Sequence, residues 1–90
     1  MIKFKSITIN KKKYYFYKIE WLDIFGDAGH RNYEDLINMK PAKKTTYAFL
    51  FKKNKKYLHT FSTYDQNDEE FSDCNVFPLG VIVSMTKINI

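Results

Sequence analysis

The chain has 90 residues, of which 44% are hydrophobic and 18% aromatic, and its formal net charge is +5. This length allows a single domain with one small core, and the apolar content excludes a disordered chain. We see no apolar run long enough for a membrane-spanning helix and no secretory signal at the N-terminus. The single cysteine, Cys74, cannot form a disulfide within the chain, so we expect a reducing, cytoplasmic environment.

The first third of the chain is predicted to contain a β-hairpin. Residues 1–9 have the composition of a strand, and the polar turn 10–13 leads into a second strand over 14–24. In the second strand one apolar face is formed by Tyr15, Tyr17, Ile19 and Trp21, which alternate with more polar residues. A period of two with aromatic residues is typical of a half-buried strand. We expect Trp21 to anchor the core with its indole N–H near a polar partner.

Residues 32–39 are predicted to form one short helix. Asn32 is suited to the N-cap, and acidic residues occupy the first turn, where they interact favourably with the helix dipole. An apolar stripe follows on Tyr33, Leu36 and Ile37. Pro41 ends the helix because the residue before a proline avoids helical angles.

The remaining sequence is predicted to be mainly β. Residues 44–52 and 57–64 are expected to form two strands joined by a lysine-rich turn, and 65–73 an acidic loop. The last strands fall within 74–88. Pro78 lacks the N–H that a central strand needs, so it marks a break between two short strands, with a turn of 3₁₀ helix there.

Together these elements predict an all-β domain with one short helix. About five to six short antiparallel strands bury their apolar faces most economically in a closed or nearly closed barrel, which also limits exposed strand edges.

Three segments resemble a group of short, mostly uncharacterised phage-encoded proteins. They are KIEWLDIFGDAGH (18–30), TTYAFLFKKNKKYLHTFST (45–63) and NVFPLGVIVSMTKI (75–88). The resemblance implies a small SH3-like barrel over 15–88, with 1–14 as an added N-terminal strand of the same domain. The chain departs from the group at Ala48, where glycine is frequent, and at Phe77, where isoleucine is frequent. The group implies a phage origin and carries no catalytic residues.

Lysines are concentrated in two predicted turns, and two interpretations are open. The first cluster is Lys11, Lys12 and Lys13, and the second is Lys52, Lys53, Lys55 and Lys56. Lysines beside tyrosines are typical of surfaces that bind phosphates and stack on bases. Alternatively, 14 lysines against a single arginine reflect genome composition, and lysine at strand edges keeps a β-protein soluble. With Arg31 the only bidentate group, sequence-specific reading of duplex DNA is not expected.

Candidate catalytic or metal-binding residues are few. Asp23, Asp27 and His30 are close in sequence, but metal sites need three or four ligands, and the spacing favours a polar turn. Cys74 has no lysine or histidine neighbour in sequence to lower its pKa, so we expect a small packed residue rather than a nucleophile. We therefore predict no enzyme activity, no metal and no cofactor.

The function predicted from the sequence is binding. The first hypothesis is a phage accessory protein of the host cytoplasm that counters defence by sequestering an anionic nucleotide signal in a homo-oligomer. Its expected contacts are Tyr17, Arg31, Lys43, Lys44 and Tyr57. The alternatives are nucleic-acid binding through the two lysine clusters and inhibition of a host protein through an exposed sheet edge.

Overall fold

The computed structural model describes residues 2–26, 28–67 and 69–90. Its elements in chain order are β1 (Ser6–Ile9), β2 (Lys12–Asp23), α1 (Tyr33–Ile37), β3 (Ala42–Lys53), β4 (Tyr57–Phe61), β5 (Thr63–Asp65), β6 (Glu70–Ser72), β7 (Asn75–Pro78), the 3₁₀ turn η1 (Leu79–Val81) and β8 (Ile82–Lys87). Every strand pair is antiparallel. The predicted all-β class with one short helix is confirmed.

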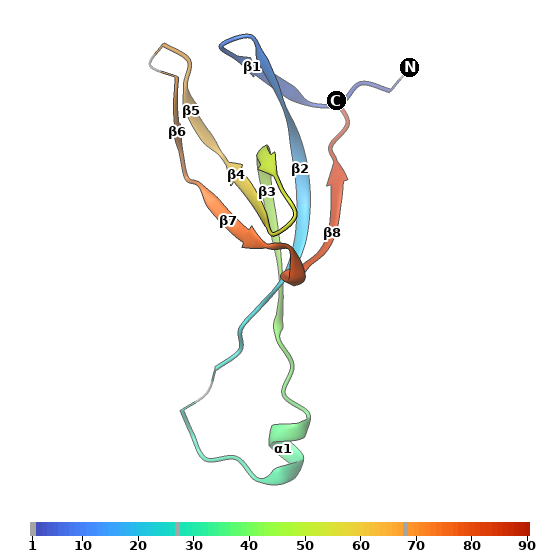
Figure 1. The fold of residues 1–90 in the computed structure, drawn as a ribbon. Helices are drawn as coiled ribbons and strands as arrows, with labels where there is room; N and C mark the ends of the chain where they lie inside the picture. Colours follow the sequence, from blue (N-terminus) through green and yellow to red (C-terminus); the bar gives the residue numbers. More distant parts are fainter. Residues whose placement is uncertain (1, 27, 68) are drawn as a thin grey trace.

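The long strand β2 lies at the centre of a six-stranded sheet (Figure 1). The strand order is β1-β2-β3-β4-β7, and β8 also pairs with β2. One edge of β2 pairs first with β1, along 12–15, and then with β8, along 17–21. Its other edge pairs with β3 from Phe16 to Asp23. The predicted N-terminal hairpin is therefore confirmed, and it is built into the same sheet as the later strands.

The sheet is not closed as a barrel, which corrects the expected closure. In the strand order β7 lies at one end, and β8 pairs only with β2 within the described residues. The turn η1 connects β7 to β8, in agreement with the 3₁₀ turn predicted at Pro78. The interruption between β7 and β8 thus falls at Pro78, as predicted. In the described residues, however, one edge of β7 pairs with no other strand.

The acidic segment 65–73, predicted to be a loop, contributes to a small hairpin instead. Strands β5 and β6 pair over three residues each and form a separate two-stranded sheet. Such short strands leave no readable alternation in the sequence. The hairpin is stabilised by Tyr64 and Phe71, which pack against a buried aromatic cluster. Tertiary packing therefore outweighs the polar composition of the segment.

Two apolar cores use the two faces of β2. The first core contains the buried residues Ile9, Tyr14, Phe49 and Phe61, and the second contains Ile19, Leu58 and Phe77. Because side chains alternate along a strand, Phe16 packs in the first core while Tyr17 and Trp21 pack in the second. The indole Nε1 of Trp21 donates a hydrogen bond to Thr46 Oγ1 at 2.9 Å, as the sequence predicted.

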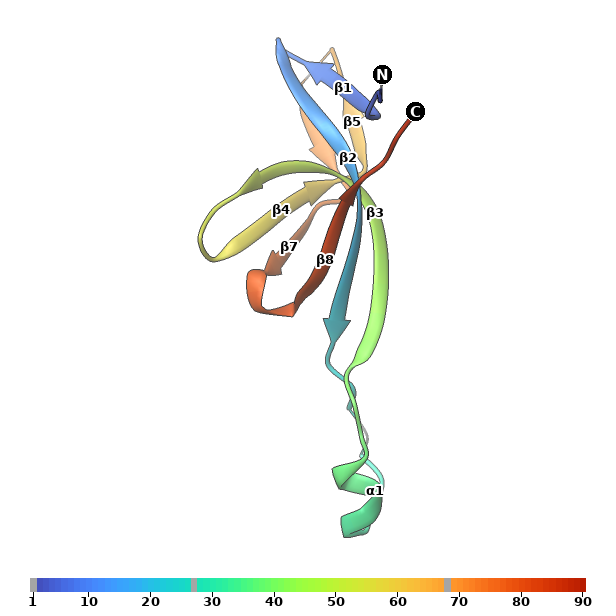
Figure 2. The ribbon, with the colours of Figure 1, turned by 90° about the vertical axis from the view of Figure 1, so that its right-hand side faces the viewer.

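Beyond the sheet, residues 24–26 and 28–41 lie in an extended segment with α1 at its far end, which we call the arm (Figures 1 and 2). The predicted helix is confirmed, and Asn32 caps it by accepting a 2.8 Å hydrogen bond from Asp35 N. None of the helix residues is buried. The Cα radius of gyration is 17.0 Å, whereas a compact domain of this length has about 12 Å. The arm thus makes the molecule elongated, to 55 Å in its longest dimension.

Phe61 is expected to be the most sensitive position of the first core. Its side chain is 1% exposed and its ring contacts those of Phe49 and Phe71. Replacing Phe61 by alanine should lower the free energy of unfolding by about 3–5 kcal/mol because the cavity cannot be refilled. Urea denaturation of the wild type, Phe61→Ala and the control Val83→Ala, at an exposed residue of β8, measures this loss. Equal midpoints for the two variants would contradict the assignment of this core.

Candidate functional site

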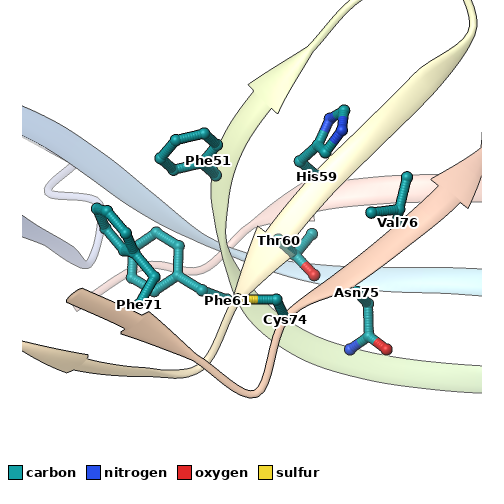
Figure 3. Close-up of a pocket in the computed structure, with 8 residues that line it drawn as sticks. All are labelled: Phe51, His59, Thr60, Phe61, Phe71, Cys74, Asn75 and Val76. Carbon is teal, nitrogen blue, oxygen red and sulfur yellow. The ribbon is translucent and has the colours of Figure 1, made fainter.

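The candidate site is a small apolar hollow beside β4, which we call the aromatic pocket (Figure 3). It has a volume of about 210 Å³ and is lined by Phe51, His59, Thr60, Phe61, Phe71, Cys74, Asn75 and Val76. Three of these are phenylalanine rings from three different strands. The pocket is therefore a product of the tertiary fold and not of any single sequence motif.

A β-bulge places Phe51 at the pocket. Leu50 pairs with Thr60 and Lys52 pairs with His59, so Phe51 is the extra residue between two consecutive pairs. A bulge bends its strand and redirects a side chain. Here the ring of Phe51 lies beside the pocket and is 38% exposed.

The opposite wall comes from the β5–β6 hairpin. The ring of Phe71 meets that of Phe61 with 4.7 Å between centroids and that of Phe51 with 5.1 Å, both edge to face. Such pairs are stabilised by the complementary charge of ring faces and edges. The aromatic wall is thus fixed by ring contacts, which present a preformed apolar surface.

His59 lines the same pocket and carries a buried polar atom. Its Nδ1 is buried and has no hydrogen-bond partner among the described residues. Figure 3 shows the His59 ring on the same side of the strands as Phe51 and Val76. A buried nitrogen without a partner is costly. The lining exposes only apolar atoms to the pocket, so His59 contributes an apolar ring surface to it.

Thr60 carries a second unpartnered atom on a different side. Its Oγ1 is buried without a hydrogen-bond partner in the described part of the chain. In Figure 3 the hydroxyl points away from the His59 side and toward the side of Asn75, its cross-strand neighbour. We therefore assign it to the sheet interior and not to ligand recognition.

The two lysine clusters approach the pocket from adjacent strands. Lys12 Nζ lies 5.5 Å from the ring centroid of Tyr14 and 5.9 Å from that of Phe51. Lys52 pairs with His59, and directly paired residues share a face of the sheet. Of the remaining cluster residues, Lys11 is in the β1–β2 turn, Lys13 and Lys53 are in β2 and β3, and Lys55 and Lys56 are in the β3–β4 turn.

Of the two tyrosines predicted to contact a ligand, one lies near the pocket. Tyr57 is exposed, and its ring centroid is 6.4 Å from that of His59, edge to face. Tyr17 is half-buried and packs in the second core, where it serves folding.

The three predicted cationic contacts lie elsewhere in the chain. Arg31 belongs to the arm, while Lys43 and Lys44 are near the start of β3. Lys43 Nζ forms a 2.7 Å ion pair with Glu20 Oε2, and Lys18 Nζ lies 3.6 Å from Glu20 Oε1. One copy of the chain therefore does not gather the five predicted contacts in a single site.

The cationic neighbours of Glu20 lower its pKa. The largest cause is the hydrogen bond from Lys43, and the charge of Lys43 comes next. Burial opposes them by raising the pKa, and Lys18 lowers it further by a smaller amount. This cluster joins β2 to β3 where the arm leaves the sheet.

The polar turn after β2 shows no metal-binding arrangement. Asp23 Oδ1 accepts a 2.9 Å hydrogen bond from Ile24 N, and Asp27 lies outside the described residues. Across residues 2–26, 28–67 and 69–90, no three His, Cys, Asp or Glu side chains are grouped closely enough to hold a metal ion. The expectation of a packed Cys74 is wrong. Its thiol is free and exposed because the short link between β6 and β7 runs along the surface beside the pocket.

The pocket was not predicted from the sequence. The sequence pattern places His59 and Phe61 on a strand, but it predicts a loop where the hairpin that carries Phe71 lies. The usable signal was the alternation of Tyr57, His59 and Phe61, which places three ring side chains on one face of β4.

Within the described part of the chain, no helix combines the length and apolar character needed to cross a membrane. Comparisons with models of known families, with curated proteins and with solved structures found no match for this chain. The binding properties are therefore inferred from the geometry of the aromatic pocket and the charges around it.

The ion pairs of Glu20 predict a pH-dependent contribution to stability. Because the pKa of Glu20 is lowered in the folded state, its carboxylate stabilises the fold above the ordinary pKa of 4.5. This contribution is lost as the pH falls through the lowered folded value. Glu20→Gln should therefore be less stable than the wild type at neutral pH, and the difference should disappear in acid.

Thermal unfolding across a pH series measures this effect. Glu70→Gln, at an exposed residue of β6, serves as the matched control. A Glu20→Gln deficit that stays constant down to the most acidic condition would rule out the ion pairs as its cause.

Proposed function

We propose that the protein is a non-catalytic binding protein whose aromatic pocket holds the base of an anionic nucleotide. The observation that carries the proposal is the apolar pocket walled by the rings of Phe51, Phe61 and Phe71, with lysines on the neighbouring strands. Aromatic walls select flat rings.

The size of the pocket supports a base and not a whole nucleotide. Its volume of about 210 Å³ is below the range of pockets that enclose complete drug-sized ligands, which begin at about 300 Å³. Stacking on exposed aromatic side chains contributes about 1–3 kcal/mol per base. Phe51 and Tyr57 are both exposed beside His59 and are suited to this contact.

Lysines close to the pocket supply the charge for the phosphate. Lys12 reaches the Phe51 ring, and Lys52 shares the His59 face of β4. A lysine ammonium binds phosphate as a point charge and sets no strict geometry. The proposed contacts are therefore Phe51, Tyr57 and His59 for the base, with Lys12 and Lys52 for the phosphate.

In the wider role that we propose, the protein is a phage accessory protein that sequesters a nucleotide defence signal in the host cytoplasm. The proposal extends to an SH3-like arrangement of the sheet. It is supported by the Pro78-containing corner, the η1 turn that follows it, and the return of β8 to pair with β2.

A second candidate function is single-stranded nucleic-acid binding. The specific observation in its favour is that the lysine clusters of β2 and β3 flank one exposed ring, Phe51. Alternating lysine charge and aromatic surface is typical of proteins that bind single strands without sequence preference.

Binding of a nucleotide should depend on the pocket residues. Isothermal titration with a panel of purine and pyrimidine nucleotides should find one class that binds, and mass spectrometry of the denatured protein would identify any ligand retained through purification. His59→Ala and Phe51→Ala should each weaken binding about tenfold or more, the loss expected for one stacked base. Tyr47→Ala, at an exposed aromatic residue on β3, is the control and should bind normally. No binding by the wild type to any nucleotide would sink the proposal.

Salt dependence separates the two candidate functions. If the ligand is a short oligonucleotide, affinity should fall steeply with salt, and Lys12→Gln or Lys52→Gln should each reduce the slope of log K against log salt by about one. If the protein recognises a mononucleotide, the slope of log K against log salt should be shallow. It should not become steeper when an oligonucleotide replaces the mononucleotide. Fluorescence anisotropy across a salt series measures both quantities.

A further inference from the structure

The outer edge of β7 presents backbone groups that no other strand uses. Among the residues that the structure describes, β7 pairs only with β4. Residues of an antiparallel strand direct their backbone groups alternately toward the paired strand and away from it. Leu79 N donates to Lys56 O at 2.9 Å, in register with the β4–β7 pairs, and this bond sets the alternation. Phe77 therefore bonds to β4, whereas Val76 directs both its N–H and its C=O outward.

Pro78 limits the length of this edge. Because proline has no N–H, the edge beyond Val76 offers an acceptor and no donor. The turn η1 then takes the chain out of the strand at Leu79. A strand that pairs with this edge thus forms few main-chain hydrogen bonds, and it must gain most of its affinity from its side chains.

Two apolar hollows flank the edge, one on each face of β7. The aromatic pocket lies on the face that carries Val76 and His59, a cross-strand pair (Figure 3). The second hollow, which we call the base groove, has a volume of about 290 Å³ and includes Trp21 and Phe77, whose rings belong to the second core on the opposite face. Both hollows are lined by Asn75 and Val76. The remaining lining residues of the base groove are Leu22, Asp23, Ile24, Pro78 and Val81, of which Asp23 alone is charged.

We propose that β7 binds an extended segment of another protein as an added antiparallel strand. In this mode of recognition main-chain hydrogen bonds hold the segment, and pockets for alternate side chains select its sequence. Consecutive side chains of a strand point to opposite faces, which matches the two hollows. The residue opposite Val76 is aromatic or large and aliphatic, and its side chain contacts the aromatic pocket. The next residue is apolar and contacts the base groove.

A foreign segment fits this edge better than a second copy of the chain. If two β7 strands paired about a two-fold axis at Val76, each Pro78 would lie opposite Cys74 of the partner subunit. Because proline has no N–H, the carbonyl of that cysteine would have no donor in either copy. The net charge of +5 on each copy also opposes such pairing. The proposal does not rest on nucleotide binding, because it depends on the backbone of β7, which is not a proposed nucleotide contact.

Peptide titration followed by calorimetry tests the proposal. The probes are end-blocked peptides of the form Glu-Thr-Val-Xaa-Val-Thr-Glu, with phenylalanine, tryptophan, leucine or glycine at the centre. The peptides with a large apolar centre should bind, and the glycine peptide should bind about tenfold more weakly or less, because it leaves the aromatic pocket empty. No binding by any of these peptides at millimolar concentration would overturn the proposal.

Backbone methylation of the peptide tests strand addition itself. N-methylation of the central residue removes the N–H that reaches the Val76 carbonyl, so it should weaken binding about tenfold or more. N-methylation of the following residue is the matched control. Its N–H points away from β7, so affinity should hardly change. Equal affinities for the two methylated peptides would contradict strand addition.

Variants at Val76 and hydrogen exchange locate the bound peptide. Val76→Pro removes the outward donor without removing a bond to β4, whereas Val76→Ala retains it, so Val76→Pro should bind the phenylalanine peptide about tenfold more weakly than Val76→Ala. Circular dichroism should show the same fold for both. In the wild type, NMR should show fast exchange of the Val76 N–H in the free protein and protection in the complex. Protection elsewhere and not at Val76, or a wild-type dimer that Val76→Pro dissociates in sedimentation velocity, would overturn the proposal.

Discussion

The fold depends on the pairing of β2 along both edges and on the burial of both its faces. Hydrogen bonds join it to β1 and β8 on one side and to β3 on the other. Because consecutive side chains of a strand point in opposite directions, the 12 residues of β2 contribute to both apolar cores. Ile19 is fully buried in one core and Tyr14 is almost fully buried in the other. Each core is small, so large aromatic side chains supply much of its apolar surface.

Local patterns predicted most of the elements. The period of two in β2, the Asn32 cap and the Pro78 break each depend on neighbours in the sequence, and each is present in the structure. The sequence did not predict the features that depend on contacts between residues far apart in the chain. The β5–β6 hairpin exists because Phe71 packs on Phe61, and the open edge exists because β8 returns to β2 without meeting β7. No local pattern reports either fact.

The candidate site was likewise predictable only in part from the sequence. The lysine clusters were visible in the sequence, and two of their members approach the aromatic pocket. The pocket itself requires a bulge at Phe51 and a hairpin assigned as a loop, so its position could not be foreseen. The aromatic pocket and the apolar groove at the base of the arm are adjacent, because both are lined by Asn75 and Val76.

Residues 3–5 also lie against residues 88–90, which follow the last strand. Lys5 N donates to Ile88 O and Ile90 N donates to Lys3 O, while Phe4 and Asn89 form an isolated bridge. During synthesis β2 therefore emerges long before the segment that completes one of its edges. Until β8 follows, that edge is open to pairing with another nascent chain, and such long-range pairing is slow to form. Completion of this sheet thus waits for β8, which follows its other strands in the sequence.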